Sequence, residues 1–426
     1  MAIGIFLTTL IGVMAVGLPI AFALLISGIA LMLFLDVFDT QIIAQNLISG
    51  ANNFSLMAVP FFILAGEFMN IGGISQRIIN VASALVGHIR GGLGFVAIIA
   101  SVLFAGLSGS AVADTAALGA ILIPMMVKNG YHRNRSVGLI ASGGILAAVI
   151  PPSIPMIIFG VISGVSITKL FLAGLFPGIL IATSLAIAWW FVVRKENYNV
   201  IPRKSRKEVF KSIKESIWAL FLPIIIICGL RFGIFTPTEA SVVVAFYAFI
   251  VGFVIYKEIK LKDIYPALVA TAKTTSVVMF LAAAAMVPAW LIAIANIPAI
   301  LADFLGPFVE KPLILMLLIT LFVILIGMAM DLTPIILILT PILMPLVELA
   351  GIDPIYFGVV FLLTAVIGLL TPPVGTLLNV ASGVGKISIE NLLKGIWPFI
   401  LAELIVLILL ILFPALVLTP LEWLTQ

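Results

Sequence analysis

Uninterrupted apolar runs, rather than alternating polar and apolar positions, dominate the chain from end to end. About 20 apolar residues in a helix suffice to cross the hydrocarbon core of a bilayer, and many of these runs reach that length. The strands of an outer-membrane barrel would instead alternate apolar and polar residues over short segments. The pattern therefore predicts an all-α, polytopic membrane protein whose helices satisfy their own backbone groups.

One apolar stretch, residues 92–126, is nearly twice as long as a single span requires. Its middle is GLSGS at 106–110, where two glycines favour a break in the helix. Basic residues lie on both sides of the stretch, which is typical of cytoplasmic loops. We therefore expect a re-entrant helical hairpin that enters from the cytoplasm. At 1.5 Å per residue, its arms should reach about the middle of the membrane.

A second stretch of this kind covers residues 312–347 and is interrupted by GMAMDLTP at 327–334. Its flanking loops lack the excess of Lys and Arg that marks the cytoplasmic side, so this hairpin is expected to enter from the outside. No Lys or Arg precedes Arg77. For that reason we expect no secretory signal peptide and place Met1 outside the cytoplasm.

The two hairpins belong to an internal repeat. Shifting the chain by 221 residues aligns eight identical glycine or proline pairs: Gly106–Gly327, Pro124–Pro345, Gly130–Gly351, Pro151–Pro372, Pro152–Pro373, Gly164–Gly385, Gly174–Gly395 and Pro177–Pro398. Because the flanking charges invert between the copies, the pattern indicates an inverted-topology repeat, as in secondary transporters. It predicts a first unit at 1–193, a basic cytoplasmic linker at 194–216 and a second unit at 217–426.

Composition narrows the functional classes. Of 426 residues, 63% are hydrophobic and 9% are charged, whereas soluble domains are about a quarter charged. A soluble enzyme, a disordered chain and a nucleic-acid-binding protein are thereby excluded. The single cysteine, Cys228, allows no internal disulfide. The two histidines, His88 and His132, lie in separate basic loops, and no transition-metal spacing occurs.

Each copy also contains a proline-broken segment, VIPPSIP at 149–155 and LTPPVGTLLN at 370–379. Paired prolines remove amide donors and leave preceding carbonyls without helical partners, and in hydrocarbon those carbonyls must be satisfied. A desolvated Na⁺ suits such oxygens, with hydroxyls available from Ser108, Ser110, Thr333 and Thr371. Half-helix N-termini would favour an anionic substrate near the midplane. The alternative is that these segments are only proline kinks packed by neighbouring helices.

Two carboxylates, Asp114 and Asp331, lie in or near the hairpin tips. Intramembrane carboxylates are costly, so each is either a cation ligand or proton carrier, or a helix N-cap. Thr376 and Asn379, just beyond the second proline pair, could face the substrate. Glu67, Glu239 and Glu403 are isolated carboxylates that we expect to have structural partners.

Three functional classes remain open at this point. The first is an Na⁺-driven importer of an organic anion. The second is an intramembrane hydrolase built on Ser108, Ser110 and Asp114, which is disfavoured because no histidine base lies in an apolar segment. The third is an ion channel or a structural membrane subunit.

Four motifs together resemble the large membrane subunit of tripartite ATP-independent periplasmic (TRAP) transporters: GLSGSAVADTAALG, AAVIPPSIPMIIFG, GMAMDLTPIILILTPILMPL and GLLTPPVGTLLNVASG. The resemblance implies an elevator-type fold in the bacterial inner membrane, with scaffold helices and a moving transport part at 88–193 and 306–418. It implies Na⁺ as coupling ion and no other cofactor. It also implies a small four-helix membrane subunit and a periplasmic substrate-binding protein as partners, and a carboxylate substrate such as a sialic acid or a C4-dicarboxylate.

The resemblance also implies two cation sites, formed mostly by backbone carbonyls. The first comprises Ser108, Ser110, Gly144, Val149 and Pro151, and the second comprises Gly327, Gly368, Thr371 and Val374. The residues expected to contact the substrate are Ser110, Asp114, Thr333, Thr376 and Asn379.

Overall fold

The computed structural model describes residues 1–194, 198, 202–304 and 306–425, and every regular element in that part of the chain is a helix. Eight of the described helices are long and apolar enough to cross a membrane. The prediction of an all-α, polytopic membrane protein is therefore confirmed.

The first repeat opens with six elements, three of which pack beside the long helix α13 (Leu261–Ile294) of the second repeat. In order, these elements are α1 (Ala2–Ala15), α2 (Ile20–Phe34), α3 (Thr40–Ala51), the 3-10 turn η1 (Phe54–Met57), α4 (Ala58–Ile71) and α5 (Ile74–Val86). Asp39 caps the N-terminus of α3, where its side chain accepts the Gln41 N–H at 2.7 Å. Gly73, in the left-handed conformation (φ +69°), immediately precedes α5.

The remainder of the first repeat contains the hairpin and the broken helix. Its elements are α6 (Gly92–Ser108), α7 (Ala111–Lys128), α8 (Arg133–Gly144), the 3-10 turn η2 (Ile145–Ala148), α9 (Ile154–Ser163) and α10 (Ile167–Val193). The break at 106–110 is confirmed. The arms, however, have 17 and 18 residues, or about 25 Å each. They are longer than the half-membrane reach expected, because the helices continue up to Ser108 and resume at Ala111.

The second repeat begins with long helices. They are α11 (Arg206–Arg231), α12 (Pro237–Ile250), the π-helical turn η3 (Val251–Ile255), α13 (Leu261–Ile294), α14 (Ile297–Phe304) and α15 (Gly306–Val309). Ser205 and Glu208 form a capping box that starts α11, so the latter part of the predicted linker is helical. Its positions 195–197 and 199–201 lie outside the described residues.

The second hairpin and broken helix follow. They comprise α16 (Pro312–Gly327), α17 (Leu332–Leu349), α18 (Pro354–Gly368), α19 (Thr376–Gly385), α20 (Ile389–Leu412) and α21 (Ala415–Thr425). A shift of 221 residues carries α7 onto α17 end for end, and the remaining late helices match within a few residues. The Pro151–Pro152 and Pro372–Pro373 bonds are both cis.

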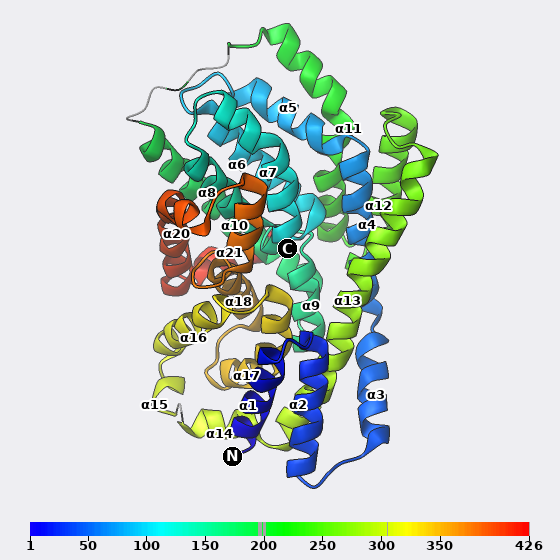
Figure 1. Ribbon diagram of the computed structural model, residues 1–426, viewed down its shortest axis with the longest axis vertical. Coiled ribbons are helices and arrows are strands. Elements are labelled where there is room, and N and C mark those ends of the chain that lie inside the picture. Colours follow the sequence, from blue (N-terminus) through cyan, green and yellow to red (C-terminus); the bar gives the residue numbers. More distant parts are fainter. Residues whose placement is uncertain (195–197, 199–201, 305, 426) are drawn as a thin grey trace.

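The two repeats interlock rather than pack as separate bodies. Helix α13 runs along one side of the molecule beside α2, α3 and α4, while the α6–α7 and α16–α17 hairpins occupy opposite halves (Figure 1). Helix α9 packs against α17 of the other repeat, and α19 packs against α7. Buried Phe159 of α9 meets Phe357 and Phe361 of α18, with ring centroids 6.3 and 5.8 Å apart. This exchange brings the breaks of both repeats into one region.

Candidate functional site

The first hairpin tip is a tight turn whose hydroxyl and carboxyl side chains lie close together. Helix α6 ends at Ser108, left-handed Gly109 (φ +62°) turns the chain, and Ser110 caps α7 by accepting the Ala113 N–H at 3.4 Å. The Ser108 hydroxyl accepts the Ser110 N–H at 3.1 Å and donates to Asp114 Oδ1. The turn thus fixes the Ser108 side chain against a carboxylate in the first turn of α7.

Asp114 is the principal buried acid of this tip. Its side chain is 1% exposed, and Oδ2 has no hydrogen-bond partner among the described residues. The N-cap of α7 is Ser110, so the N-cap interpretation does not hold for Asp114. It does hold for Asp331, which is exposed, caps α17 and accepts the Leu332 N–H at 2.9 Å. A buried carboxylate oxygen without a donor is a natural ligand for a cation.

The first proline break packs directly on this tip. The Ile154 N–H donates to Gly109 O at 3.4 Å. A Cβ placed on Gly109 would lie 2.8 Å from Pro152 O, and one on Gly106 would lie 3.3 Å from Pro151 O. One on Gly144 would lie 3.0 Å from Ala111 O. The structure therefore gathers Ser108, Ser110, Gly144 and Pro151 around the start of α7.

Val149 occupies a different side of the same break. Its carbonyl oxygen would lie 2.1 Å from a Cβ on Gly174, so it is directed at α10. The neighbouring Ala148 carbonyl accepts the Ser153 hydroxyl at 2.9 Å. The Val149 oxygen is thus directed at α10, whereas the Pro151 oxygen lies against Gly106 of α6 at the first tip.

The second tip is closed by backbone contacts. A Cβ on Gly327 would lie 2.9 Å from both Ala365 O and Gly368 Cα, so α16 and α18 touch main chain to main chain. The Met328 carbonyl accepts the Val374 N–H at 3.2 Å and the Gly375 N–H at 3.0 Å. Gly327, Gly368 and Val374 are therefore brought together.

Thr371 lies in the second break and is partly buried. Its hydroxyl donates to Ile367 O at 3.0 Å, and its N–H donates to Gly368 O at 2.9 Å. The hydroxyl oxygen keeps lone pairs that could coordinate a cation. The Val374 carbonyl, by contrast, already accepts the Asn379 amide at 3.0 Å.

The substrate candidates divide between the two tips. Ser110 and Asp114 belong to the first tip, whereas Thr376 donates to Asp331 Oδ1 at 3.4 Å beside the second. Asn379 is exposed, and Thr333 in the first turn of α17 is partly buried. Helix α19, which carries Thr376 and Asn379, packs against α7, which carries Asp114.

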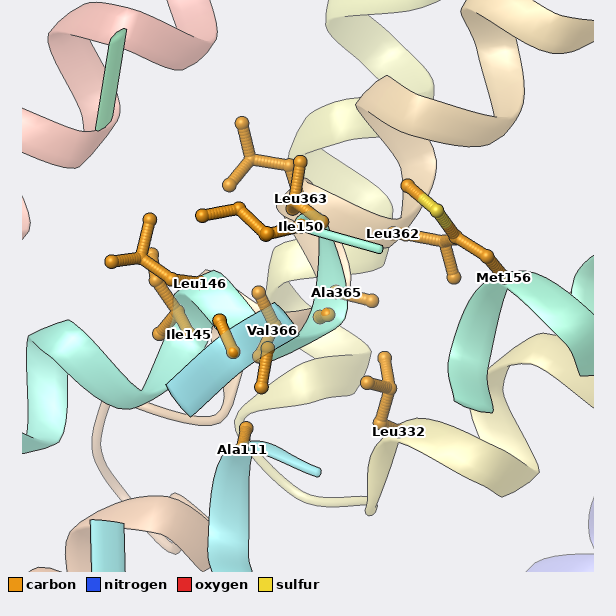
Figure 2. Packing of buried hydrophobic residues seen from close by; sticks show 14 of the residues in the cluster. Ala111, Ile145, Leu146, Ile150, Met156, Leu332, Leu362, Leu363, Ala365 and Val366 are labelled. Carbon is orange, nitrogen blue, oxygen red and sulfur yellow. The ribbon is translucent and has the colours of Figure 1, made fainter. Parts of the chain in front are cut away.

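The starts of α7 and α17 face one apolar cluster shared by the repeats. Figure 2 labels Ala111 and Leu332, their first residues, together with Ile145 and Leu146 of η2 and Val366 of α18; η2 packs on α7 and on α18, and α18 packs on α17. These side chains are buried. Two helix N-termini, each with a partial positive charge, thus lie close to the same water-poor region. Such an arrangement suits an anion bound next to cations.

The described residues contain no group of three His, Cys, Asp or Glu side chains able to hold a metal ion. A cation bound among the described residues must therefore take most of its ligands from hydroxyls and carbonyls. That donor set fits Na⁺ better than a transition metal.

The expectation that the isolated carboxylates have structural partners holds for Glu239 but not for Glu403. Glu239 has the structural partner expected, since it completes a capping box with Thr236. Glu403 is fully buried, yet neither carboxyl oxygen has a hydrogen-bond partner among the described residues. The 221-residue shift could have identified it, because it aligns Glu403 with Ala182.

Comparison with known proteins identifies the family of this chain. The family model described as "Tripartite ATP-independent periplasmic transporter, DctM component" matches residues 7–416. The 2,3-diketo-L-gulonate TRAP transporter large permease protein YiaN of Escherichia coli (strain K12) is 53% identical over 423 residues, which cover 99% of this chain and 100% of YiaN. The sialic acid TRAP transporter large permease protein SiaM of Vibrio cholerae is 41% identical over 404 residues, 95% of each chain.

Among solved structures, the YdaH transporter of Alcanivorax borkumensis superposes with a TM-score of 0.62 at 14% identity, covering 88% of this chain and 87% of YdaH. This likeness supports the fold alone. The relatives are transporter permease proteins, so the prediction that the chain is not an enzyme is confirmed, as is its assignment to the bacterial inner membrane. The chain belongs to the DctM component family of tripartite ATP-independent periplasmic transporters, as the large permease protein.

Proposed function

We propose that the chain uses a Na⁺ gradient to import an organic acid, delivered by a periplasmic binding protein, in a complex with a small four-helix membrane subunit. The observation that carries the Na⁺ dependence is Asp114, a buried carboxylate with one oxygen lacking a donor at the first hairpin tip. Family membership supports an organic acid as the substrate class and the two partners.

The first Na⁺ would be held near Ser108, Ser110, Gly144, Val149 and Pro151, and the second near Gly327, Gly368, Thr371 and Val374. Asp114 would supply the negative charge of the first site, with Ser108 orienting it. The second site would rely on carbonyl dipoles and the Thr371 hydroxyl. Both sets fit the oxygen ligands that a hard cation prefers.

Coupling follows from electrostatics. A carboxylate substrate near Ser110, Thr333, Thr376 and Asn379 would meet the like charge of Asp114 in a region of low dielectric. A bound Na⁺ removes that repulsion, so ion and substrate favour each other's binding reciprocally. Transport in one direction then draws on the ion gradient.

The hairpins and broken helices would move together as an elevator against the scaffold of α1–α5 and α11–α13. The packing of α7 on α19 and of α9 on α17 supports a common motion of the two hairpins and broken helices. Each hairpin would be re-entrant, the first from the cytoplasm and the second from the outside.

The test is uptake by proteoliposomes containing both membrane subunits, with the binding protein added outside. Sialic acid, 2,3-diketo-L-gulonate and a C4-dicarboxylate are each offered under a Na⁺ gradient and under a K⁺ gradient. Uptake of one of them should require Na⁺ and proceed without ATP. Uptake indifferent to Na⁺, or ion conduction without the binding protein, would refute the proposal.

Two substitutions test the site assignment. Ser110→Ala and Thr371→Ala should raise the Na⁺ concentration needed for half-maximal uptake, because each removes a candidate ligand oxygen. Ser276→Ala and Thr274→Ala are matched controls, since both hydroxyls are exposed on α13 and bond only within their own helix. An unchanged Na⁺ response in both test variants would show that the site lies elsewhere.

A further inference from the structure

Glu403 lies near the middle of α20, a helix long enough to span the membrane. Its side chain is 0% exposed, and both carboxyl oxygens lack a hydrogen-bond partner among the described residues. It is distinct from the hairpin tips, since no candidate ligand belongs to α20. A charged carboxylate in this position would be desolvated without compensation.

Ser142 of α8 lies beside the Glu403 carboxyl but outside hydrogen-bond geometry. Its hydroxyl is also buried and has no partner in the described part of the chain. The interface is tight, because a Cβ on Gly138 of α8 would lie 2.9 Å from Ile396 Cα of α20. The two polar groups thus face each other between closely packed backbones.

Charged groups on the helices around Glu403 are remote from it. Arg135 is about 10 Å along α8 from Ser142, and Lys394 is about 13 Å along α20 from Glu403. Tyr356 of α18 donates to Leu410 O at 3.1 Å, nearly two turns beyond Glu403. The titratable residues of the described helices packed on α20 are Arg133 and Arg135 of α8, Lys169 of α10, Tyr356 of α18 and Glu422 of α21; α16 and α19 contain none, and α20 itself adds Glu390 and Lys394.

The fold does not require a polar pair here. The 221-residue shift aligns Glu403 with Ala182 and Ser142 with Leu363, so the corresponding positions of the other copy are apolar. Leu363 is fully buried in its helix. One copy of the repeat therefore carries a costly group that the other copy shows to be dispensable for packing. Such a group is a functional candidate.

We propose that Glu403 is a proton-binding site: it is held as a neutral carboxylic acid whose O–H points to the Ser142 hydroxyl across the α8–α20 interface. A proton is the one ligand that needs only a carboxyl and a single neighbouring oxygen. A metal cation would need several more oxygen ligands. The nearby hydroxyls of Ser101 and Thr115 contact α8 at Gly143 and Gly144. Because each residue of a helix is rotated by about 100° from the one before, these two positions face away from Ser142. Glu403 itself belongs to neither hairpin tip, although Ser142 lies two residues before Gly144, a candidate ligand of the first Na⁺ site.

The test is infrared spectroscopy of the large and small subunits in lipid vesicles. The spectrum of the Glu403→Gln variant is subtracted from that of the unchanged protein. At neutral pH the difference should contain a carboxylic-acid C=O band that shifts in D₂O and disappears at strongly alkaline pH. The control is Glu348→Gln, at an exposed position of α17. The spectrum of this variant should still contain the carboxylic-acid band. A difference spectrum that shows only the carboxylate bands at neutral pH would overturn the proposal, because Glu403 would then be ionised.

Ser142→Ala provides a second measurement should Glu403→Gln fail to assemble. It keeps the acid and removes its neighbour, so the C=O band should persist at a shifted frequency. An unshifted band would contradict the pairing with Ser142. Uptake measurements supply a further distinction. The Glu403→Gln variant should keep the Na⁺ dependence of uptake at neutral pH and should not show the fall in uptake at alkaline pH that ionisation of Glu403 would cause. A weakened Na⁺ dependence would identify Glu403 as a metal-cation ligand and overturn the proton site.

Discussion

The contact between Gly327 and Gly368 offers a direct test of how the second tip is built. In Gly327→Ala, the new Cβ would start 2.9 Å from Ala365 O and from Gly368 Cα. Ordinary contacts between carbon atoms lie near 3.5–4.0 Å, so α16 and α18 must separate by roughly 0.6–1 Å. Both sides of the contact are main chain, and no side-chain rotation can relieve it.

The expected loss of stability combines two opposing terms. Overpacking of this kind costs about 1–3 kcal/mol, whereas replacing a helical glycine with alanine contributes about 0.5–1 kcal/mol. The net loss in the free energy of unfolding is therefore roughly 0–2.5 kcal/mol, and about 1 kcal/mol when the middle of each range is taken. The separation also affects Met328, the next residue, whose carbonyl accepts the Val374 and Gly375 N–H groups. A shifted Met328 would weaken the proposed second Na⁺ site.

The assay is thermal unfolding of the purified protein, first without Na⁺ and then with increasing NaCl at constant ionic strength. Bound Na⁺ stabilises the native state by mass action, and each 1.4 kcal/mol lost in binding raises the required concentration about tenfold. Gly383→Ala is the matched control, because no described heavy atom lies within 4 Å of its Cβ position. If Gly327→Ala melted as high as this control, with the same Na⁺ response, the steric reasoning would be refuted.

Two further substitutions test other contacts. Ser108→Ala should lower the melting temperature, since Asp114 loses its hydrogen-bond donor at a cost of about 1.5–3 kcal/mol; an effect no larger than that of Ser276→Ala would contradict this. Arg77→Met should destabilise by about 1 kcal/mol, less at high salt, because Arg77 pairs with Glu258 at 2.7 Å and stacks 3.7 Å above the Tyr256 ring. Glu258→Gln should cost less, as it leaves the stacking intact, and equal losses in the two variants would show that the ring contributes nothing.

The backbone plan of the fold could be predicted from the sequence because its signals are local. Each run has a glycine at a helix end: left-handed Gly109 (φ +62°) of GLSGS follows α6, and Gly327 of GMAMDLTP is the last residue of α16, whereas prolines such as Pro345 lie inside continuous helices. The 221-residue shift then places corresponding breaks in corresponding copies. Helices α7 and α17 accordingly begin and end at equivalent positions.

The chemistry of single residues could not be predicted in this way, because it depends on distant neighbours. Asp114 and Asp331 look alike in sequence, yet one is buried beside Ser108 and the other is an exposed N-cap. The direction of the Val149 carbonyl follows from its packing on Gly174 of α10. No local pattern encodes either contact.

The two tips therefore share a backbone plan but differ in charge. At the first tip, Asp114 leaves a buried oxygen without a donor. At the second, the Met328 carbonyl is already bonded twice and Asp331 is exposed. A cation at the first tip would interact with a full negative charge in a medium of low dielectric, and at the second mainly with dipoles. If both tips bind Na⁺ as proposed, the first should bind it more tightly, and loss of Ser108 should affect the Na⁺ response more than loss of Thr371.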